Sequence, residues 1–233
     1  MNSWLLGRGN FASDVRQGSV YFESDGLRIH AYTYCRGDSV GKPALIVCHG
    51  RTPESLELSG IARKIAEYGF FALNLEGRGR GKSEGGEQEL WNEQGYLRDV
   101  MAAVDFTLGL DVDRQRVAII GQSLGSGTAI IAAAHEPRLK ACVALHPYSD
   151  YAFSTEPRPG DPDVRRPVDY VAQIAPRPLL IIAGEKDETL PVAGAHELYD
   201  AAGDPKRLLI VQDGTHSIED TEVYALGWLL TNV

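Results

Sequence analysis

Hydrophobic and polar residues form two patterns along this chain, short apolar runs and longer amphipathic stretches. An uninterrupted apolar run of about four to eight residues is typical of a buried strand, whereas apolar residues three and four apart indicate a helix. The apolar runs predict strands at residues 44–48, 70–75, 116–121, 140–145, 178–183 and 207–212. The helical spacing predicts helices at residues 54–68, 87–110, 124–135, 192–202 and 218–230. Gly95 is the expected break in the second helix.

Two further strands are predicted ahead of this series, at residues 19–24 and 27–34, because Asp25-Gly26 between them favours a tight hairpin turn. The rest of the chain alternates strand and helix, and such units build a largely parallel sheet with right-handed crossovers. We therefore expect an α/β fold with a mostly parallel eight-stranded sheet, flanked by helices, and an antiparallel hairpin at one edge.

Residues 147–176 depart from this alternation. The segment is polar and carries six prolines, which disfavour long regular elements. We expect it to form a loop or a small cap over the site, with a short helix at residues 168–174. The length of 233 residues suits one domain, which then covers residues 1–233 with this segment as its insertion.

Composition narrows the classes of partner. The formal net charge of −9 argues against a nucleic-acid partner, which would favour a basic surface. No apolar run approaches the ~18 residues of a membrane span, and residues 1–18 lack the apolar stretch of a secretory signal. The three cysteines, Cys35, Cys48 and Cys142, are odd in number and form no C-x-x-C pair. We therefore expect a cytoplasmic protein without disulfides.

The sequence Gly121-Gln122-Ser123-Leu124-Gly125 matches the pattern G-x-S-x-G between a predicted strand and a predicted helix. In such a turn the glycines relieve crowding, and the serine hydroxyl projects from the carboxyl end of the strand. The following helix points its free N–H groups and partial positive charge at the same place. Ser123 is therefore the candidate nucleophile, and the alternative is a plain turn in which this serine only caps the helix.

A serine at neutral pH needs a base, and the base needs a carboxylate that orients it. Of the six histidines, His216 lies in the loop after the last predicted strand and is the candidate base. His146 ends the strand after the nucleophile helix, so it is a candidate for the pocket wall and the alternative base. His49 ends its own strand and is better placed to shape a loop.

The carboxylate is expected in the loop that follows the strand at residues 178–183. Asp187 is the candidate, and its neighbours Glu185 and Glu188 have a lesser claim. Asp150, just past the preceding strand, is the alternative. With Asp187 as the acid, the chain order is serine, aspartate, histidine, which is the order of a nucleophile-elbow hydrolase.

An oxyanion on the substrate needs N–H donors. The backbone N–H of Leu124 is one candidate, and the N–H of Arg51, in the loop after the strand at 44–48, is the other. Arg78 and Arg80 lie in a glycine-rich loop and are candidates for the substrate pocket. With Arg51 they can favour an acidic or polar acyl group, since arginine grips carboxylates through two hydrogen bonds. The alternative is that they are solvated loop charges or structural anchors.

Together these motifs resemble the α/β-hydrolase superfamily over residues 19–233. Loop 76–83 looks like the family's D-x-R-G-x-G-x-S loop, with Glu76 near the usual aspartate position. Segment 174–187 makes the chain most similar to compact dienelactone-hydrolase-like and prolyl-oligopeptidase-like serine esterases. Dienelactone hydrolases themselves use a cysteine nucleophile where this chain has Ser123. The large extra domain that gates prolyl peptidases has no counterpart in the pattern.

The resemblance implies the α/β-hydrolase fold and hydrolysis of a small carboxylic ester or thioester through an acyl-enzyme, without a cofactor or a metal. A small peptidase, an acyltransferase and a non-catalytic ligand-binding protein on the same fold are the alternatives, because fold alone does not define function. The sequence leaves open the natural substrate and the oligomeric state, monomer or homodimer.

Overall fold

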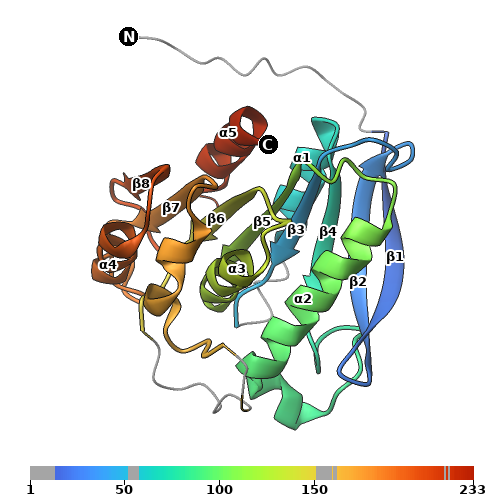
Figure 1. The fold of residues 1–233 in the computed structure, drawn as a ribbon, viewed down its shortest axis with the longest axis horizontal. Helices are drawn as coiled ribbons and strands as arrows, with labels where there is room; N and C mark the ends of the chain where they lie inside the picture. The colour runs from blue at the N-terminus through green and yellow to red at the C-terminus, as the bar shows by residue number, and fades with distance from the viewer. Residues whose placement is uncertain (1–13, 52–57, 151–158, 160–161, 218, 220) are drawn as a thin grey trace.

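The structure is a computed structural model that describes residues 14–51, 58–150, 159, 162–217, 219 and 221–233. One central sheet of eight strands is covered by helices on both faces (Figure 1). Helices α2 (Glu93–Gly109), α3 (Leu124–His135) and α4 (Ala193–Ala201) pack on one face. Helices α1 (Ser59–Glu67) and α5 (Glu222–Asn232) pack on the other.

The strands run in the order β1-β2-β4-β3-β5-β6-β7-β8 across the sheet. Their bounds are Val15–Ser24 (β1), Leu27–Arg36 (β2), Ala44–Cys48 (β3), Phe71–Glu76 (β4), Val117–Gln122 (β5), Ala141–Leu145 (β6), Leu179–Gly184 (β7) and Lys206–Val211 (β8). Strand β2 is antiparallel to both β1 and β4, and the pairs from β4 to β8 are parallel. The predicted mostly parallel sheet with an antiparallel hairpin at its edge is therefore confirmed.

Each central strand contributes to two cores, because successive side chains point to opposite faces of a sheet. In β3, Ala44, Ile46 and Cys48 pack on the side of α2, α3 and α4. Leu45 and Val47 pack on the side of α1 and α5. All five residues of this strand are buried, which explains its unbroken apolar sequence.

The predicted helix break at Gly95 is wrong. A short 3-10 helix, η2 (Glu87–Trp91), precedes α2, and the boundary lies at Asn92. The Asn92 side chain accepts a 2.8 Å hydrogen bond from the N–H of Gly95, which satisfies a free donor at the helix start. Gly95 instead lies in the first turn of α2, where a Cβ would come within 2.5 Å of Nη1 of Arg78. This glycine is therefore needed for packing.

Two other predicted helices differ from the structure. In place of one helix at 168–174 there are two 3-10 helices, η3 (Pro167–Asp169) and η4 (Val171–Ile174). Helix α5 begins at Glu222, later than the predicted start at residue 218. Parts of the predicted helix 54–68 and of the predicted cap 147–176 lie outside the described residues.

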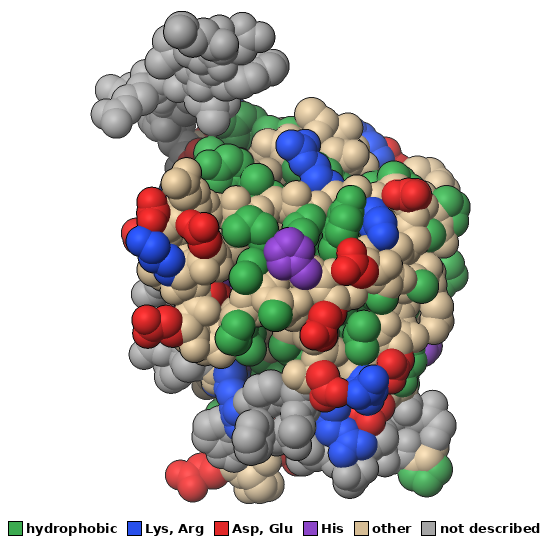
Figure 2. All heavy atoms as spheres, turned by 90° about the vertical axis from the view of Figure 1, so that its left-hand side faces the viewer, with side chains coloured by type: hydrophobic (Ala, Val, Ile, Leu, Met, Phe, Trp, Pro, Cys, Tyr) green, Lys and Arg blue, Asp and Glu red, His purple; other side chains and the backbone are tan. Residues whose placement is uncertain are grey.

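The structure shows where the cysteines and the charged side chains lie (Figure 2). All three cysteines are buried and free. On the molecular face shown in Figure 2, acidic and basic side chains are interspersed with hydrophobic ones. Within the described part of the chain, no helix combines the length and the apolar character that crossing a membrane requires.

Candidate active site

The candidate residues follow neighbouring strands at one edge of the sheet. Ser123 directly follows β5, and His146 directly follows β6. Asp187 and His216 lie in the loops after β7 and β8. Because these four strands are parallel neighbours, their carboxyl ends share one edge, where α/β proteins bind ligands.

Ser123 occupies a strained turn between β5 and α3. Its backbone has φ 53° and ψ −120°, a left-handed conformation that is rare for a residue with a side chain. A Cβ at Gly121 would collide with the carbonyl of Gly125, and a Cβ at Gly125 would collide with the carbonyls of Cys48 and His49. Both glycines of the G-x-S-x-G pattern are therefore required for the turn and for its contact with the loop after β3.

The backbone around Ser123 is held from both sides of the turn. Its N–H donates to the carbonyl of Leu145 at 2.9 Å, which ties the turn to β6. Its carbonyl accepts the N–H of Ser126 at 2.9 Å at the start of α3. Ser123, the residue that precedes this helix, is partly exposed. The partial positive charge of a helix N-terminus there favours a developing oxyanion.

Asp187 and His216 form a hydrogen bond. Nδ1 of the partly exposed His216 ring lies 2.7 Å from Oδ2 of the buried Asp187 carboxylate. The other carboxylate oxygen, Oδ1, accepts the backbone N–H groups of Thr189 and Leu190, both at 2.9 Å. Burial by itself raises the pKa of Asp187, but the Leu190 N–H and the His216 ring outweigh it and keep this pKa below its usual value. The carboxylate is therefore ionised and held in place.

The loops that carry Asp187 and His216 touch through Gly184, at the end of β7. A Cβ at Gly184 would lie 2.5 Å from the carbonyl oxygen of Gly214 and would also meet the carbonyl of Thr215. The N–H of Lys186 donates to the carbonyl of Gly214 at 2.8 Å. Sequence reasoning missed this role of Gly184, for which the only signal was a glycine directly before the Asp187 loop.

His146 lies behind Asp187. Its Nδ1 is 3.1 Å from the same Oδ2 atom that contacts His216, and its side chain has no exposed surface. Its Nε2 lies 3.1 Å from the carbonyl oxygen of Ser217 and 3.4 Å from Oγ1 of Thr221. Burial is the main cause that lowers the pKa of His146. The ring thus connects the aspartate loop to the loop that leads into α5, and it presents no open surface to a substrate.

His146, Asp187 and His216 are also spaced closely enough to hold a cation. Among the described residues, their possible ligand atoms lie within 4.8 Å of one another. Both Nδ1 atoms, however, are at hydrogen-bond distance from one carboxylate oxygen. A cation between these atoms would replace the two hydrogen bonds that orient the rings.

The loop after β3 is held by His49, which shapes it as predicted. Nε2 of this buried ring accepts the N–H of Gly77 at 3.0 Å, so Nδ1 carries the proton and donates to the carbonyl of Gly50 at 2.6 Å. The ring stacks on Tyr96 with centroids 4.7 Å apart, and the Tyr96 hydroxyl donates to the His49 carbonyl at 3.2 Å. Burial lowers the pKa of His49 to about 4, so the ring stays neutral. These contacts fix the chain next to Arg51, the candidate second oxyanion donor.

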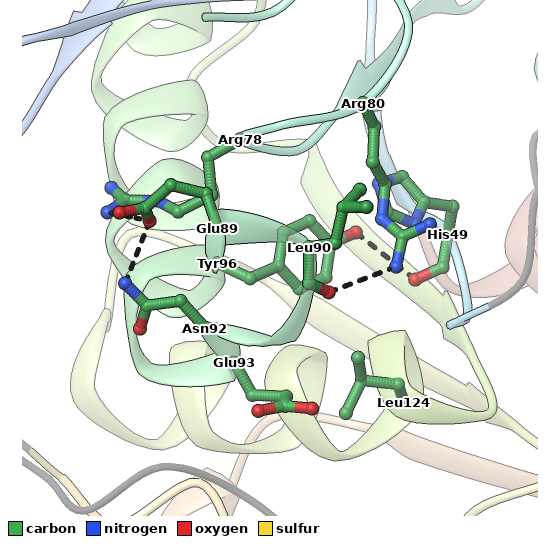
Figure 3. Close-up of a pocket in the computed structure, with 9 residues that line it drawn as sticks. All are labelled: His49, Arg78, Arg80, Glu89, Leu90, Asn92, Glu93, Tyr96 and Leu124. Atoms are coloured by element: carbon green, nitrogen blue, oxygen red, sulfur yellow. Dashed lines mark hydrogen bonds and ion pairs between the residues drawn. The ribbon is translucent and has the colours of Figure 1, made fainter. Parts of the chain in front are cut away.

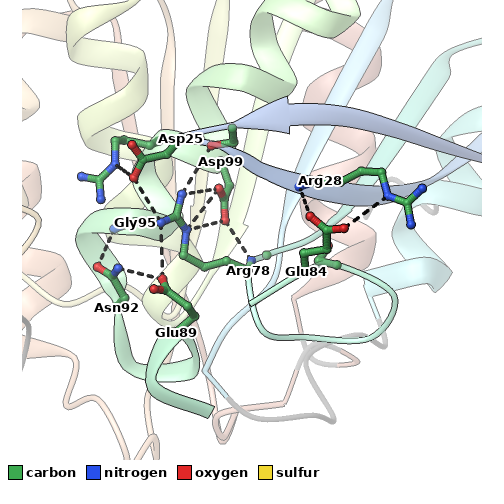
Figure 4. Close-up of polar contacts among 12 residues, drawn as sticks. Asp25, Arg28, Arg78, Glu84, Glu89, Asn92, Gly95 and Asp99 are labelled. Atoms are coloured by element: carbon green, nitrogen blue, oxygen red, sulfur yellow. Dashed lines mark hydrogen bonds and ion pairs between the residues drawn. The ribbon is translucent and has the colours of Figure 1, made fainter. Parts of the chain in front are cut away.

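The structure separates the two candidate arginines of loop 76–83. Arg78 is buried among carboxylates: Nη2 lies 2.8 Å from Asp99, and Nη1 lies 3.4 Å from Glu89 and 3.5 Å from Asp25 (Figure 4). Its charge therefore joins the hairpin, the glycine-rich loop and α2. The guanidinium of Arg80 instead points toward the carbonyl of Leu90 in a recess that also includes Leu124 (Figure 3).

The alternative acids have other surroundings. Asp150 pairs with Arg166, and both side chains are about half exposed. Glu185 accepts the N–H of Asp213 at 3.1 Å, and Glu188 is exposed. Among these carboxylates, Asp187 is the one that the structure brings to His216.

A mostly parallel eight-stranded sheet, with a strained serine turn after one strand and acid and histidine loops after later strands, defines the α/β-hydrolase fold. The model of the serine aminopeptidase S33 family matches residues 41–159. The chain belongs to this family of α/β hydrolases.

Individual relatives and structures agree with this class. YfhR, an uncharacterized protein of Escherichia coli O157:H7, is 28% identical over 180 residues, which are 74% of this chain and 62% of YfhR. The match thus spans less than two thirds of that relative. The α/β hydrolase GrgF from Penicillium sp. sh18 has a TM-score of 0.78 at 20% identity, covering 93% of this chain and 99% of GrgF. An esterase domain from Rhodothermus marinus has a TM-score of 0.69 at 20% identity, covering 92% and 96%.

Proposed function

We propose that this chain is a serine hydrolase that cleaves a carboxylic ester or thioester with Ser123 as nucleophile, His216 as base and Asp187 as the acid that orients it. One observation carries the proposal. The 2.7 Å contact between His216 and the buried Asp187 carboxylate lies at the sheet edge where the strained turn presents Ser123. A serine can act at neutral pH only beside such an oriented base.

In the first half of the reaction, Nε2 of His216 takes the proton of the Ser123 hydroxyl as its oxygen attacks the ester carbonyl. Asp187 keeps the proton of His216 on Nδ1, so Nε2 has the free lone pair, and it stabilises the imidazolium that forms. The carbonyl oxygen becomes an oxyanion, which the N–H groups of Leu124 and Arg51 stabilise. Each such donor typically lowers the barrier by about 3 kcal/mol.

The tetrahedral intermediate then collapses, and the bond to the leaving alcohol or thiol breaks. His216 gives its proton to that group, and the acyl chain remains as an ester on Ser123. A water molecule then attacks the acyl carbonyl while His216 takes one of its protons. The bond from the acyl group to Ser123 breaks, His216 returns the proton to Ser123, and the carboxylic acid is released. The cycle consumes one water and needs no redox partner.

The experiment combines covalent labelling with ester hydrolysis. A fluorophosphonate probe should label the wild-type chain at one site, and 4-nitrophenyl acetate or butyrate should be hydrolysed. Ser123→Ala should lose both, with kcat reduced by roughly a millionfold. Ser39→Ala, in the loop between β2 and β3, is the matched control and should keep both. Equal labelling of Ser123→Ala and wild type, or no labelling of either, would refute the proposal.

Peptide hydrolysis is the second candidate, because the matching family model is that of a serine aminopeptidase. The same triad chemistry serves esters and amides, and the leaving group distinguishes them. Wild-type kcat/KM should be compared for one acyl group presented as a 4-nitrophenyl ester and as a 4-nitroanilide, and for aminoacyl 4-nitroanilides with a free amine. Preference for the aminoacyl anilides over the esters would establish the peptidase instead.

A further inference from the structure

Arg80 stands apart from the other charged residues near the proposed nucleophile. It lies in the loop after β4, is half-buried, and lines a narrow recess. The same recess is lined by Leu124, the residue after Ser123 whose N–H we assign to the oxyanion. A group bound by Arg80 would therefore lie in the recess that Leu124 also lines.

The other arginines near this recess have carboxylate partners within the protein. Arg78 lies among three carboxylates, of which Asp99 is the nearest at 2.8 Å. Nη2 of Arg51 lies 3.9 Å from Oε1 of the buried Glu93. In Figure 3 the Glu93 carboxylate lies beside Leu124, whereas the Arg80 guanidinium points to another part of the recess.

Arg80 has no carboxylate partner among the described residues. Its hydrogen bond is to a neutral group: Nη2 donates to the carbonyl oxygen of Leu90 at 3.3 Å. Burial is the main cause that lowers the pKa of this guanidinium, and the positive charge of Arg51 acts in the same direction, while Tyr96 and the Glu93 carboxylate oppose them without cancelling the effect of burial. Partly burying a charge without a directly paired counter-ion is unfavourable, and an anion that binds the guanidinium would reduce this cost.

We propose that Arg80 forms a subsite for a carboxylate group carried by the substrate, so that the preferred substrates are esters or thioesters with a second, ionised carboxyl group. This inference rests on the proposed hydrolase function. The bond to Leu90 uses one Nη2 proton, and the other N–H groups of the planar guanidinium suit a carboxylate with two parallel hydrogen bonds. The Glu93 carboxylate repels an anion in the recess, so an anion is expected to bind near Arg80.

The test uses two esters that differ in charge. The mono-4-nitrophenyl ester of glutaric acid carries a free carboxylate. Methyl 4-nitrophenyl glutarate has the same acyl chain and leaving group, but its second carboxyl group is a neutral methyl ester. The ratio of kcat/KM for the anionic ester over the neutral one should exceed ten for wild type. Arg80→Gln should lower this ratio by about 10- to 100-fold, the usual effect of losing a charge-assisted pair of hydrogen bonds.

Two further variants distinguish a specific contact of Arg80 with the carboxylate from a general effect of charge or of folding. Arg80→Lys keeps the charge but loses the planar fork, so its ratio should lie between those of wild type and Arg80→Gln. Arg207→Gln, on the exposed side of β8, removes the same charge elsewhere and should leave the ratio unchanged. If Arg80→Gln keeps the wild-type ratio, or lowers kcat/KM equally for both esters, the subsite is refuted.

A binding measurement tests the subsite independently of catalysis. Glutarate should raise the melting temperature of wild type and of Ser123→Ala, and should leave that of Arg80→Gln unchanged. If wild type cleaves neither ester and takes up no fluorophosphonate, the proposed function fails while the glutarate measurement still tests Arg80. Equal stabilisation of wild type and Arg80→Gln by glutarate would refute the subsite alone.

Discussion

Asp187 holds His216 through a 2.7 Å contact between its Oδ2 atom and Nδ1 of the ring. The same oxygen is 3.1 Å from Nδ1 of the buried His146, while Oδ1 accepts the N–H groups of Thr189 and Leu190. The carboxylate is therefore fixed by two rings on one oxygen and by the backbone on the other. The orientation of His216 depends on all of these contacts.

Asp187→Asn tests the electrostatic part of this arrangement. Asparagine keeps an oxygen for the N–H groups of Thr189 and Leu190, so the loop should keep its shape. It places an amide against His216, which favours the wrong tautomer and leaves the imidazolium unpaired. We expect kcat for 4-nitrophenyl esters to fall by roughly ten-thousandfold with KM little changed. A loss below tenfold, measured on a variant with wild-type circular dichroism, would contradict the assignment.

His146 should act as a positioning residue, and two substitutions separate its contacts. His146→Leu removes the donor to Asp187, so kcat/KM should fall about tenfold, the usual effect of one lost hydrogen bond to a charged group. Asp187 would then interact with His216 alone, and the loss should fall on kcat with KM little changed. His146→Asn offers an amide donor and tolerates the φ of 48°, so it should recover part of the activity. A rise in KM with unchanged kcat for His146→Leu would contradict this role.

Gly184→Ala should separate the loops that carry the acid and the base. The added Cβ would lie 2.5 Å from the carbonyl oxygen of Gly214, so the His216 loop must shift. A displacement of about 1 Å in a reacting group can cost about a hundredfold in rate, and we expect that loss in kcat. Gly227→Ala is the control, because nothing lies within 4 Å of its added Cβ in helix α5. It should gain up to about 1 kcal/mol of stability and keep wild-type kcat.

His49 predicts how stability depends on pH. Burial lowers its pKa from 6.5 to about 4 in the folded protein, so between these values only the unfolded chain binds the proton. The free energy of unfolding should therefore be highest above pH 6.5 and fall as the pH drops toward 4, by about 3 kcal/mol from this group. The lowered pKa of His146 acts in the same direction.

Urea unfolding at a series of pH values, for wild type and His49→Gln, measures this contribution. Glutamine can still accept the N–H of Gly77, so the variant should fold. It should be less stable than wild type at pH 8 and should lose less stability between pH 7 and pH 4.5. Parallel curves for the two proteins would show that the His49 ring does not titrate as predicted.

The sequence by itself determined most of the strands and helices and their order along the chain. The predicted strand at 44–48 coincides with β3, and the predicted helix at 124–135 coincides with α3. These predictions succeed because side-chain periodicity and turn chemistry act over a few neighbouring residues. Ser123, Asp187 and His216 could also be named in advance, because each follows a strand of a parallel sheet, and such strand ends meet at one edge. Their catalytic roles stay predictions.

Only the tertiary structure decided which polar groups meet. Arg78 and Arg80 are two residues apart in a glycine-rich loop and line the same recess, yet Arg78 is buried among carboxylates from the hairpin and α2, whereas Arg80 donates to a backbone carbonyl. The second contact of Asp187, to His146, also depends on how the loops after β6 and β7 approach each other. Such pairings are set by long-range packing, in which a shift of a few ångströms exchanges one partner for another. A local pattern carries no information on that distance.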